Sequence, residues 1–449
     1  MRAVVLVLGL MLAPLAGASP IAFTGVNVVP MDEERQLPDH TVVVDAGRIV
    51  AVGPVGEVEV PEGARVVDGR GHWLMPGLAE MHGHVPPVAQ AAALDNVLDL
   101  FLANGVTTVR GVLGEPGHLA LRDSLASGER QGPRLLTSGP SLNGNTVGSP
   151  EQAVELVEAQ KAAGYDLAKL HPGLTLENFD AIMEAANRVG LPVVGHVPAA
   201  AGIEHALSMG MACIEHMDDY VRGLVPEDRP ERTASPGFFG LDAAMAADRA
   251  RIPVLVEATR SSGAAISPTE TLMVSILGST PAEEMLDWPE MKYVAPATKA
   301  QWQASRAGAQ SAQGFSRERA DRFLQLRREL LKALHDGGVP IVLGSDAPQV
   351  FNVPGFSAHR EMALMVEAGL TPFQALRTGT VEVARHIGAE GHRGVVAPGM
   401  AADLVLLGAD PLADIANAGR IEGVMVAGRW YDRADLDARL ARVEQAVGE

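Results

Sequence analysis

Short apolar segments alternate with helical patterns through the middle of this chain, and that alternation limits the folds open to it. The strand candidates are residues 74–81, 106–110, 134–138, 167–170, 192–196, 212–216, 264–267 and 340–345. The helical patterns of residues 151–163 and 177–189 end at Gly164 and Gly190, where glycine commonly stops a helix. Such a series of βα units predicts a (β/α)8 (TIM) barrel, with an open doubly wound sheet as the second choice.

β-rich sequence flanks this α/β middle on both sides. Strand-like runs lie at residues 21–24, 41–45 and 48–52 near the start, and at 403–407 and 421–431 near the end. Isolated hairpins would be marginally stable, so both ends are expected to pair into one domain. We predict a composite β-sandwich of residues 19–72 and 395–449 around a barrel of residues 73–394. A long irregular insertion is expected at about 218–315, and the sequence assigns it no chemistry.

The first residues have the pattern of an export signal. A short basic start precedes an apolar run, Met1 to Leu12, that is too short for a stable bilayer anchor. Residues 16–18 then give the small-x-small pattern of a signal-peptidase site. We expect residues 1–18 to be a signal peptide cleaved before Ser19, which gives a secreted or periplasmic protein without a membrane attachment. An uncleaved N-terminal anchor is the alternative.

The net charge limits the classes of binding partner, and the cysteine content limits disulfide bonding. A net charge of -19 at pH 7 argues against nucleic acid and anionic membranes as partners. The single cysteine, Cys213, has no partner for an intramolecular disulfide, and its apolar surroundings suggest a buried small side chain rather than a nucleophile. The oligomeric state is left open, and a homo-oligomer is compatible with the sequence.

Metal-competent side chains stand at several of the predicted strand ends. His82 and His84 end the first strand candidate, and residues i and i+2 of a strand share a face, so both imidazoles can point at one ion. Further strand ends carry Lys169, His196, His216 and Asp346. Each residue alone could be scaffold, but the active residues of barrel enzymes lie at the carboxyl ends of the strands. Their convergence predicts a metal site. The histidines expected to be structural are His40, His72, His118, His205, His335, His386 and His392.

These motifs resemble those of the amidohydrolase superfamily, metal-dependent hydrolases built on a (β/α)8 barrel. Within it the chain is most similar to imidazolonepropionase-like and Xaa-Pro dipeptidase-like members. The resemblance runs from about residue 21 to 431 and is carried by residues 75–84, 105–110, 202–207, 214–216, 344–346 and 399–405. These motifs are specific for the superfamily and carry little information about the substrate.

The resemblance implies a binuclear centre, with zinc as the expected ion. The buried metal would be held by His82, His84 and Asp346, and the more exposed one by His196 and His216. Lys169, carboxylated to a carbamate, would bridge both metals. An ammonium has no lone pair to donate, whereas a carbamate is an anion with two oxygens. The ligand types are also compatible with Mn²⁺, Co²⁺ or Fe²⁺.

The implied reaction is hydrolysis of a small amide, either a dipeptide or an N-acyl amino acid. A metal-bridging hydroxide would be the nucleophile, and Asp346 would be the general base and acid. The candidates for substrate binding are His171, Asn143, Arg222 and His359. Alternatives are a cyclic-amide, lactone or ester hydrolase of the same superfamily, and a non-catalytic binding protein on the same fold. True imidazolonepropionases use one metal and need no bridging lysine, so Lys169 argues against that role.

Overall fold

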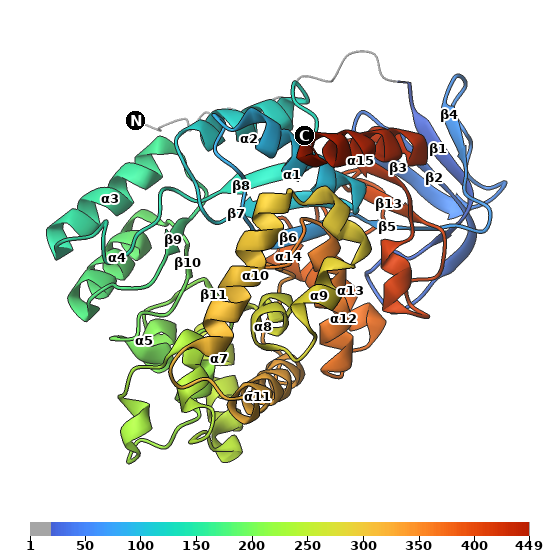
Figure 1. Ribbon diagram of the computed structural model, residues 1–449. Helices are drawn as coiled ribbons and strands as arrows, with labels where there is room; N and C mark the ends of the chain where they lie inside the picture. Colours follow the sequence, from blue (N-terminus) through green and yellow to red (C-terminus); the bar gives the residue numbers. More distant parts are fainter. Residues whose placement is uncertain (1–18, 449) are drawn as a thin grey trace, which may run out of the picture.

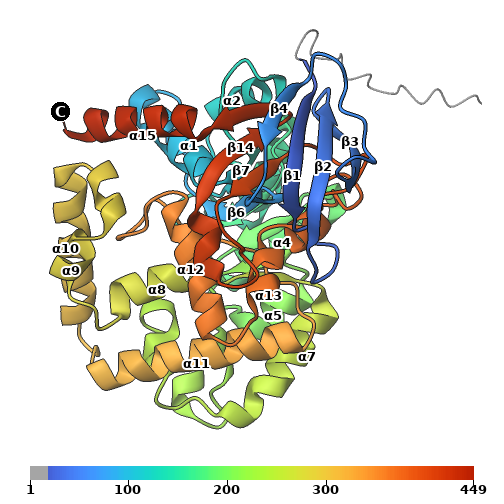
Figure 2. The ribbon, with the colours of Figure 1, turned by 90° about the vertical axis from the view of Figure 1, so that its right-hand side faces the viewer.

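The computed structural model describes residues 19–448, and the expected signal peptide lies outside the described residues. An α/β body carries a separate β-sheet on one side (Figure 1). In the view turned by 90°, strands β1 to β3 stand together at the edge of the molecule, away from helices α9, α10 and α11 (Figure 2). None of the helices in the described part of the chain is long and apolar enough to cross a membrane.

Strands from both ends of the chain share one eight-stranded sheet, in the order β15-β14-β13-β5-β1-β2-β3, with β4 paired to β1. These strands are β1 (Ile21–Val28), β2 (Leu37–Asp45), β3 (Arg48–Pro54), β4 (Arg65–Asp68), β5 (Trp73–Pro76), β13 (Leu404–Leu407), β14 (Ile421–Val426) and β15 (Arg429–Asp432). The two ends meet where β13 pairs antiparallel with β5, Leu404 opposite Pro76. A sandwich of two packed sheets stays a prediction.

The body contains two parallel sheets, which establishes the α/β class. One is formed by β6 (Leu78–Gly83), β7 (Val106–Gly111) and β8 (Arg134–Thr137). The other is formed by β9 (Ala168–Leu170), β10 (Val193–Gly195), β11 (Cys213–Glu215) and β12 (Ala265–Ser267). Isolated parallel bridges link their edges: Ser138 to Leu167, Ile266 to Ile341, and Gly83 to Ala347. Regular pairing is confined to the two sheets, so closure into a continuous barrel stays a prediction.

Helices follow most of these strands. The α-helices are α1 (Ala91–Ala103), α2 (Gly117–Ser127), α3 (Pro150–Ala163), α4 (Leu176–Val189), α5 (Gly202–Ser208), α6 (Tyr220–Gly223), α7 (Ile252–Ser262), α8 (Glu270–Leu277), α9 (Ala282–Leu286), α10 (Pro296–Ser311), α11 (Arg317–Asp336), α12 (Phe356–Glu367), α13 (Pro372–Thr378), α14 (Val381–His386) and α15 (Arg433–Gly448). Short 3₁₀ turns are η1 (Pro230–Arg232), η2 (Phe238–Ala243), η3 (Arg249–Arg251), η4 (Pro289–Tyr293) and η5 (Ile415–Gly419).

Helices α3 and α4 end where the sequence predicted. Ser149 and Thr175 cap their amino termini by accepting hydrogen bonds from backbone N–H groups of the first turn. Gly164 and Gly190 close their carboxyl termini with φ values of 89° and 66°, a left-handed conformation that glycine adopts without a steric penalty.

The segment 218–315 is more ordered than the sequence suggested. It contains helices α7 to α10 and strand β12. Two of its prolines start helices instead of interrupting them, because Pro253 and Pro296 lie in the first turns of α7 and α10, where the missing N–H has no helical partner to lose. Trp302 is buried on α10 and packs with the main core.

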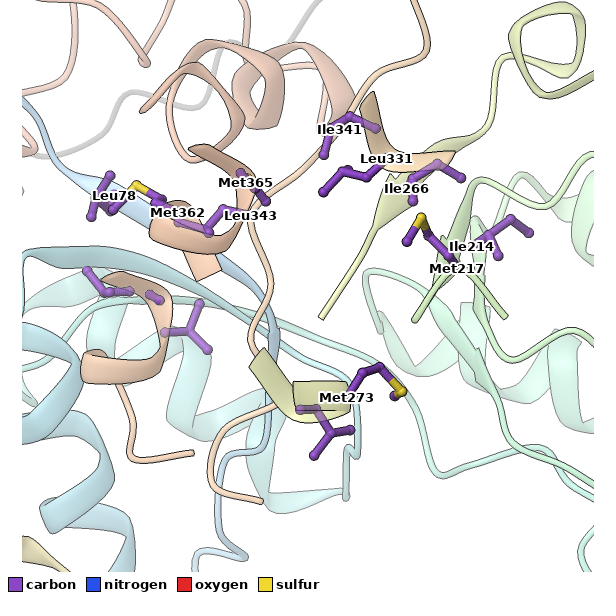
Figure 3. Close-up of a cluster of buried hydrophobic side chains, with 14 of the residues drawn as sticks. Leu78, Ile214, Met217, Ile266, Met273, Leu331, Ile341, Leu343, Met362 and Met365 are labelled. Atoms are coloured by element: carbon purple, nitrogen blue, oxygen red, sulfur yellow. The ribbon is translucent and has the colours of Figure 1, made fainter. Parts of the chain in front are cut away.

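The core beneath the strands combines aliphatic and methionine side chains from distant elements. Figure 3 shows Leu78 of β6, Ile214 of β11 and Ile266 of β12 in one cluster with residues of α11 and α12. Leu331 of α11 and Met365 of α12 are fully buried there. This packing fixes the strands, and the strands in turn position the side chains that follow their carboxyl ends.

Candidate metal centre

Three of the predicted ligands converge in space. Potential ligand atoms of His82, His84 and Asp346 all lie within 4.8 Å of one another. His84 Nε2 is 2.6 Å from Asp346 Oδ1, and His82 Nε2 is 3.5 Å from the same oxygen. The backbone aligns them, because Asp346 N–H donates to the His82 carbonyl at 2.9 Å and His84 N–H donates to the Ala347 carbonyl at 2.8 Å.

Two more predicted ligands extend this cluster into an arc of imidazoles. Ring centroids are 4.5 Å apart for His82 and His216, 4.6 Å for His216 and His196, and 5.5 Å for His196 and His171. His196 and His216 directly follow β10 and β11, which pair in parallel, so their strand ends meet at one edge. The structure therefore brings together all four histidines that the sequence assigned to metal.

Lys169 completes the set of six. It lies in β9 opposite Val194 of β10, and its side chain is completely buried. Within residues 19–448 its Nζ has no hydrogen-bond partner. Burial lowers the pKa of Lys169, while the charges of Glu215 and Asp346 act in the opposite direction. An unpaired buried amine is costly, and its carboxylated form would place two oxygens at this point.

Burial keeps two of the imidazoles, those of His82 and His216, in the form that binds metal. It lowers the pKa of His82 to about 4, and the nearby Lys169 acts in the same direction. The pKa of His216 is held well below its ordinary value by burial and then by the neighbouring His82 and His196. Burial alone would raise the pKa of Asp346, but His82 and His84 outweigh it and lower that pKa. Neutral imidazoles and an ionised carboxylate are the ligand forms of a divalent cation such as Zn²⁺, so the donor set and the orphaned amine fit a metal centre.

Polar groups behind the histidines fix the orientation of three rings. His82 Nδ1–H donates to Glu215 Oε2 at 2.5 Å, His216 Nδ1 is 2.8 Å from Thr269 Oγ1, and His196 Nδ1 is 3.0 Å from Asp218 Oδ2. Each contact occupies Nδ1, so Nε2 is the ring nitrogen that remains for a metal ion. Partners of this kind set the tautomer and ring orientation of metal-binding histidines.

Glu215 is itself held by a buried arginine. Arg110 donates to Glu215 Oε1 at 2.6 Å and to the Met81 carbonyl at 2.6 Å. Burial would raise the pKa of Glu215, but Arg110 and His82 hold it well below its usual range. Sequence reasoning assigned no role to Glu215 or Arg110. The available signal was a single charged residue inside each of two otherwise uncharged, buried strands, where an unpaired charge is disfavoured.

Two of the predicted substrate residues lie beside the centre. His171 Nδ1 is 2.6 Å from Ser141 Oγ, and Asn143 Nδ2–H donates to the same hydroxyl at 3.1 Å. All three side chains are partly exposed. They form a polar border next to His196, and substrate binding by His171 and Asn143 stays a prediction.

The other two predicted substrate residues are engaged elsewhere. Arg222 is buried, pairs with Asp219 at 2.6 Å and donates to the Ala199 carbonyl at 3.0 Å. His359 Nε2 is 2.9 Å from the carbonyl of Asn104, near the amino-terminal start of β7, whereas the histidines of the arc stand at carboxyl ends of strands. The structure does not bring His359 to the cluster, and a substrate role for Arg222 stays a prediction.

Residues expected to be structural have structural contacts. His205 on α5 is 2.6 Å from Asp180, and His118 Nε2 donates to the Pro86 carbonyl at 3.0 Å. Cys213 is fully buried, and burial raises the pKa of its thiol to about 12, so it is protonated at neutral pH.

Sequence comparison matches residues 73–431 to the model of the Amidohydrolase family. The imidazolonepropionase of Ralstonia nicotianae is 27% identical over 414 residues, which cover 86% of this chain and 90% of that protein. The adenine deaminase of Chelativorans sp. is 28% identical over 193 residues, and the match spans 39% of this chain and only 32% of the deaminase.

Comparison with solved structures finds proteins that share the fold of this chain. A provisionally identified prolidase from Bifidobacterium longum superimposes with a TM-score of 0.70 at 25% identity, covering 95% of this chain and 99% of that one. A Xaa-Pro dipeptidase with bound methionine superimposes with a TM-score of 0.68 at 20% identity, covering 92% of this chain and 100% of the other.

Proposed function

This chain belongs to the amidohydrolase family, and from that membership and the geometry of the site we propose that it is a metal-dependent hydrolase of a small amide, either a dipeptide or an N-acyl amino acid. The observation that carries the proposal is the buried Lys169 amine, unpaired within the described residues and set among metal-competent side chains. A packed core tolerates such an amine only where it gains a partner.

The proposed centre holds two divalent ions, with zinc as the expected metal. His82, His84 and Asp346 would hold one ion, His196 and His216 would hold the other, and carboxylated Lys169 would supply oxygens to both. When bound, such ions polarise a scissile carbonyl and lower the pKa of a water molecule to near neutrality.

Asp346 is the proposed proton carrier. Its lowered pKa keeps it ionised at neutral pH. His84 contacts its Oδ1, and its other oxygen, Oδ2, lies 3.8 Å from His216 Nδ1. That oxygen can take a proton from the attacking water and return it to the leaving nitrogen. His171 and Asn143 would contact the polar part of the substrate from the border described above.

The proposal extends to the architecture and the location of the protein. Within residues 73–394, the strands from β6 onward would form one closed (β/α)8 barrel, supported by the bridges at the edges of the two parallel sheets. Residues 19–72 and 395–449 would form the sandwich domain, and removal of residues 1–18 would give a secreted or periplasmic enzyme.

An imidazolonepropionase-like reaction on a cyclic amide is the second candidate. It is supported by the similarity to the Ralstonia protein over 86% of this chain. Metal content separates the two candidates, because the first requires about two metals per chain and a carboxylated lysine.

The test is a screen of purified protein against dipeptides and N-acyl amino acids, with and without chelator, in which released amine is measured. We expect amine release that chelator abolishes and added Zn²⁺ restores. Lys169→Met should lose both metal and activity, whereas Lys299→Met on α10 should keep both. Asp346→Asn with full activity would remove Asp346 from proton transfer. Metal-replete protein that releases amine from no member of the library would refute the proposal.

A further inference from the structure

An aromatic side chain lies against the imidazole arc from the segment that follows β11. The Phe239 ring centroid is 5.1 Å from that of His216 and 5.7 Å from that of His196. Phe238 packs edge-on against Phe239 with centroids 4.7 Å apart, and 37% of Phe238 is exposed. Two adjacent phenylalanines therefore run from solvent to the proposed metal ligands.

The backbone under Phe239 has an unfavourable conformation. Phe239 has φ 52° and ψ 25°, and Gly237 and Gly240 on either side have φ values of 67° and 92°. A bulky L-residue rarely adopts positive φ, and such positions persist only where the surrounding structure holds them. The two glycines adopt the other positive φ values of this turn without a steric penalty, and the resulting backbone places the Phe239 ring against the histidines.

The base of the turn is anchored on the body. Asp242 pairs with Arg319 of α11 at 3.1 Å, and its backbone N–H donates to the Pro236 carbonyl at 3.2 Å. Gly240 and Leu241 are buried, with Leu241 in the main core. Phe239 thus projects from a fixed support and is only partly buried itself.

Polar side chains also lie beside the arc, next to His196. His171, Ser141 and Asn143 form the border beside His196 and are partly exposed. A substrate held at the centre would therefore meet both hydrogen-bonding groups and an aromatic ring. Apolar side chains are favoured against phenylalanine rings, because contact removes both surfaces from water.

We propose that Phe239, backed by Phe238, determines specificity by receiving an apolar side chain of the substrate next to its scissile amide. This inference rests on the proposed function and narrows its substrate class to amides of aliphatic or aromatic amino acids. Phe239 acts on substrate recognition and has no part in proton transfer.

The experiment compares N-acetylglycine, N-acetyl-L-leucine and N-acetyl-L-phenylalanine with the wild type, Phe239→Ala and Phe239→Leu, all with measured metal content. Loss of a well-filled apolar contact is worth about 10- to 200-fold in selectivity. We expect Phe239→Ala to lower kcat/KM for the leucine and phenylalanine substrates at least about tenfold through KM, and to change the glycine substrate by less than about threefold. Phe239→Leu should retain most of the preference.

Phe315→Ala is the matched control, since Phe315 packs against the main core just before α11. An equal loss for all three substrates, or a loss that follows metal content, would show that Phe239 only supports the histidines, and it would overturn the inference while the proposed function stands.

Binding measured by calorimetry decides the inference separately from catalysis. L-phenylalanine and glycine, the corresponding products, are titrated into wild type and Phe239→Ala. If Phe239→Ala binds L-phenylalanine more weakly than wild type does, and binds glycine equally well, the result supports the inference. This holds even if none of the acetylated amides is cleaved, which would mean only that these amides are not substrates. Unchanged binding of L-phenylalanine overturns the inference.

Discussion

Removing the guanidinium of Arg327 should destabilise the protein and loosen His216. Arg327 lies on α11 and is completely buried. It donates to the His216 carbonyl at 2.6 Å, to the Pro268 carbonyl at 2.8 Å and to Glu270 Oε1 at 2.6 Å. One side chain therefore ties the end of β11 to the end of β12, where Thr269 contacts the His216 ring.

Arg327→Met keeps most of the aliphatic stem and removes all three hydrogen bonds. Leaving Glu270 without its buried partner costs about 3–5 kcal/mol, and the two carbonyls add more unless water reaches them. For a domain of this size the unfolding entropy is on the order of 0.9 kcal/mol/K, so the loss corresponds to a Tm lower by about 4 °C or more. Arg328→Met is the matched control, because Arg328 is largely exposed and its pair with Glu367 is 3.7 Å long.

The assay is calorimetry of wild type, Arg327→Met, Glu270→Gln and the double variant, with metal content measured in parallel. Removing both partners leaves no unpaired buried charge, so the double variant should lose less than the sum of the single variants. Metal per chain should fall in Arg327→Met and stay unchanged in Arg328→Met. Additive losses, or a Tm of Arg327→Met within about 1 °C of wild type, would refute this reasoning.

Two further predictions concern buried carboxyl groups. Glu215→Gln removes the anion that orients His82, so we expect metal affinity to fall about 10- to 100-fold in chelator competition, and unchanged affinity would contradict that role. Burial raises the pKa of Glu361 to about 8, above the ordinary 4.5, so the folded state keeps a proton that the unfolded chain releases. Wild type should therefore lose up to about 1.4 kcal/mol of unfolding free energy per pH unit as pH rises between these values. Urea titrations at pH 5.5 and 7.5 should show that the unfolding free energy of Glu361→Gln changes less with pH than that of wild type. An equal change in both proteins would contradict the raised pKa of Glu361.

The convergence of the metal-competent side chains was predictable because their geometry is local to strands. His82 and His84 share a strand face by the two-residue period of a strand, and the ends of parallel strands such as β10 and β11 gather at one edge. The joining of the two chain ends in one sheet was predictable for a similar reason, since short hairpins do not stand alone. Neither inference needs a side-chain contact to be known.

The supporting residues were not predictable, because their roles depend on contacts between distant elements. Arg110 and Glu215 are 105 positions apart, and Arg327 reaches His216 across 111 positions. Phe239 lies in a segment whose prolines indicated only irregular chain. Its place beside the histidines follows from the positive φ values of this turn and from the ion pair between Asp242 and Arg319 of α11. No periodic sequence pattern encodes either feature.

The charge of the buried cluster depends on the state of Lys169. Arg110 and Arg327 each have a carboxylate partner at 2.6 Å, Glu215 and Glu270, so those pairs are neutral. The histidines are neutral as well where burial lowers their pKa. With a free ammonium, Lys169 would cancel Asp346, and the cluster would have no net attraction for a cation. Carboxylation turns that positive charge into a negative one, and the same residues then present two anions to the space between the imidazoles. Because both arginines are paired, the state of Lys169 sets the charge that a cation would meet in the proposed site, and so decides whether that site can hold metal.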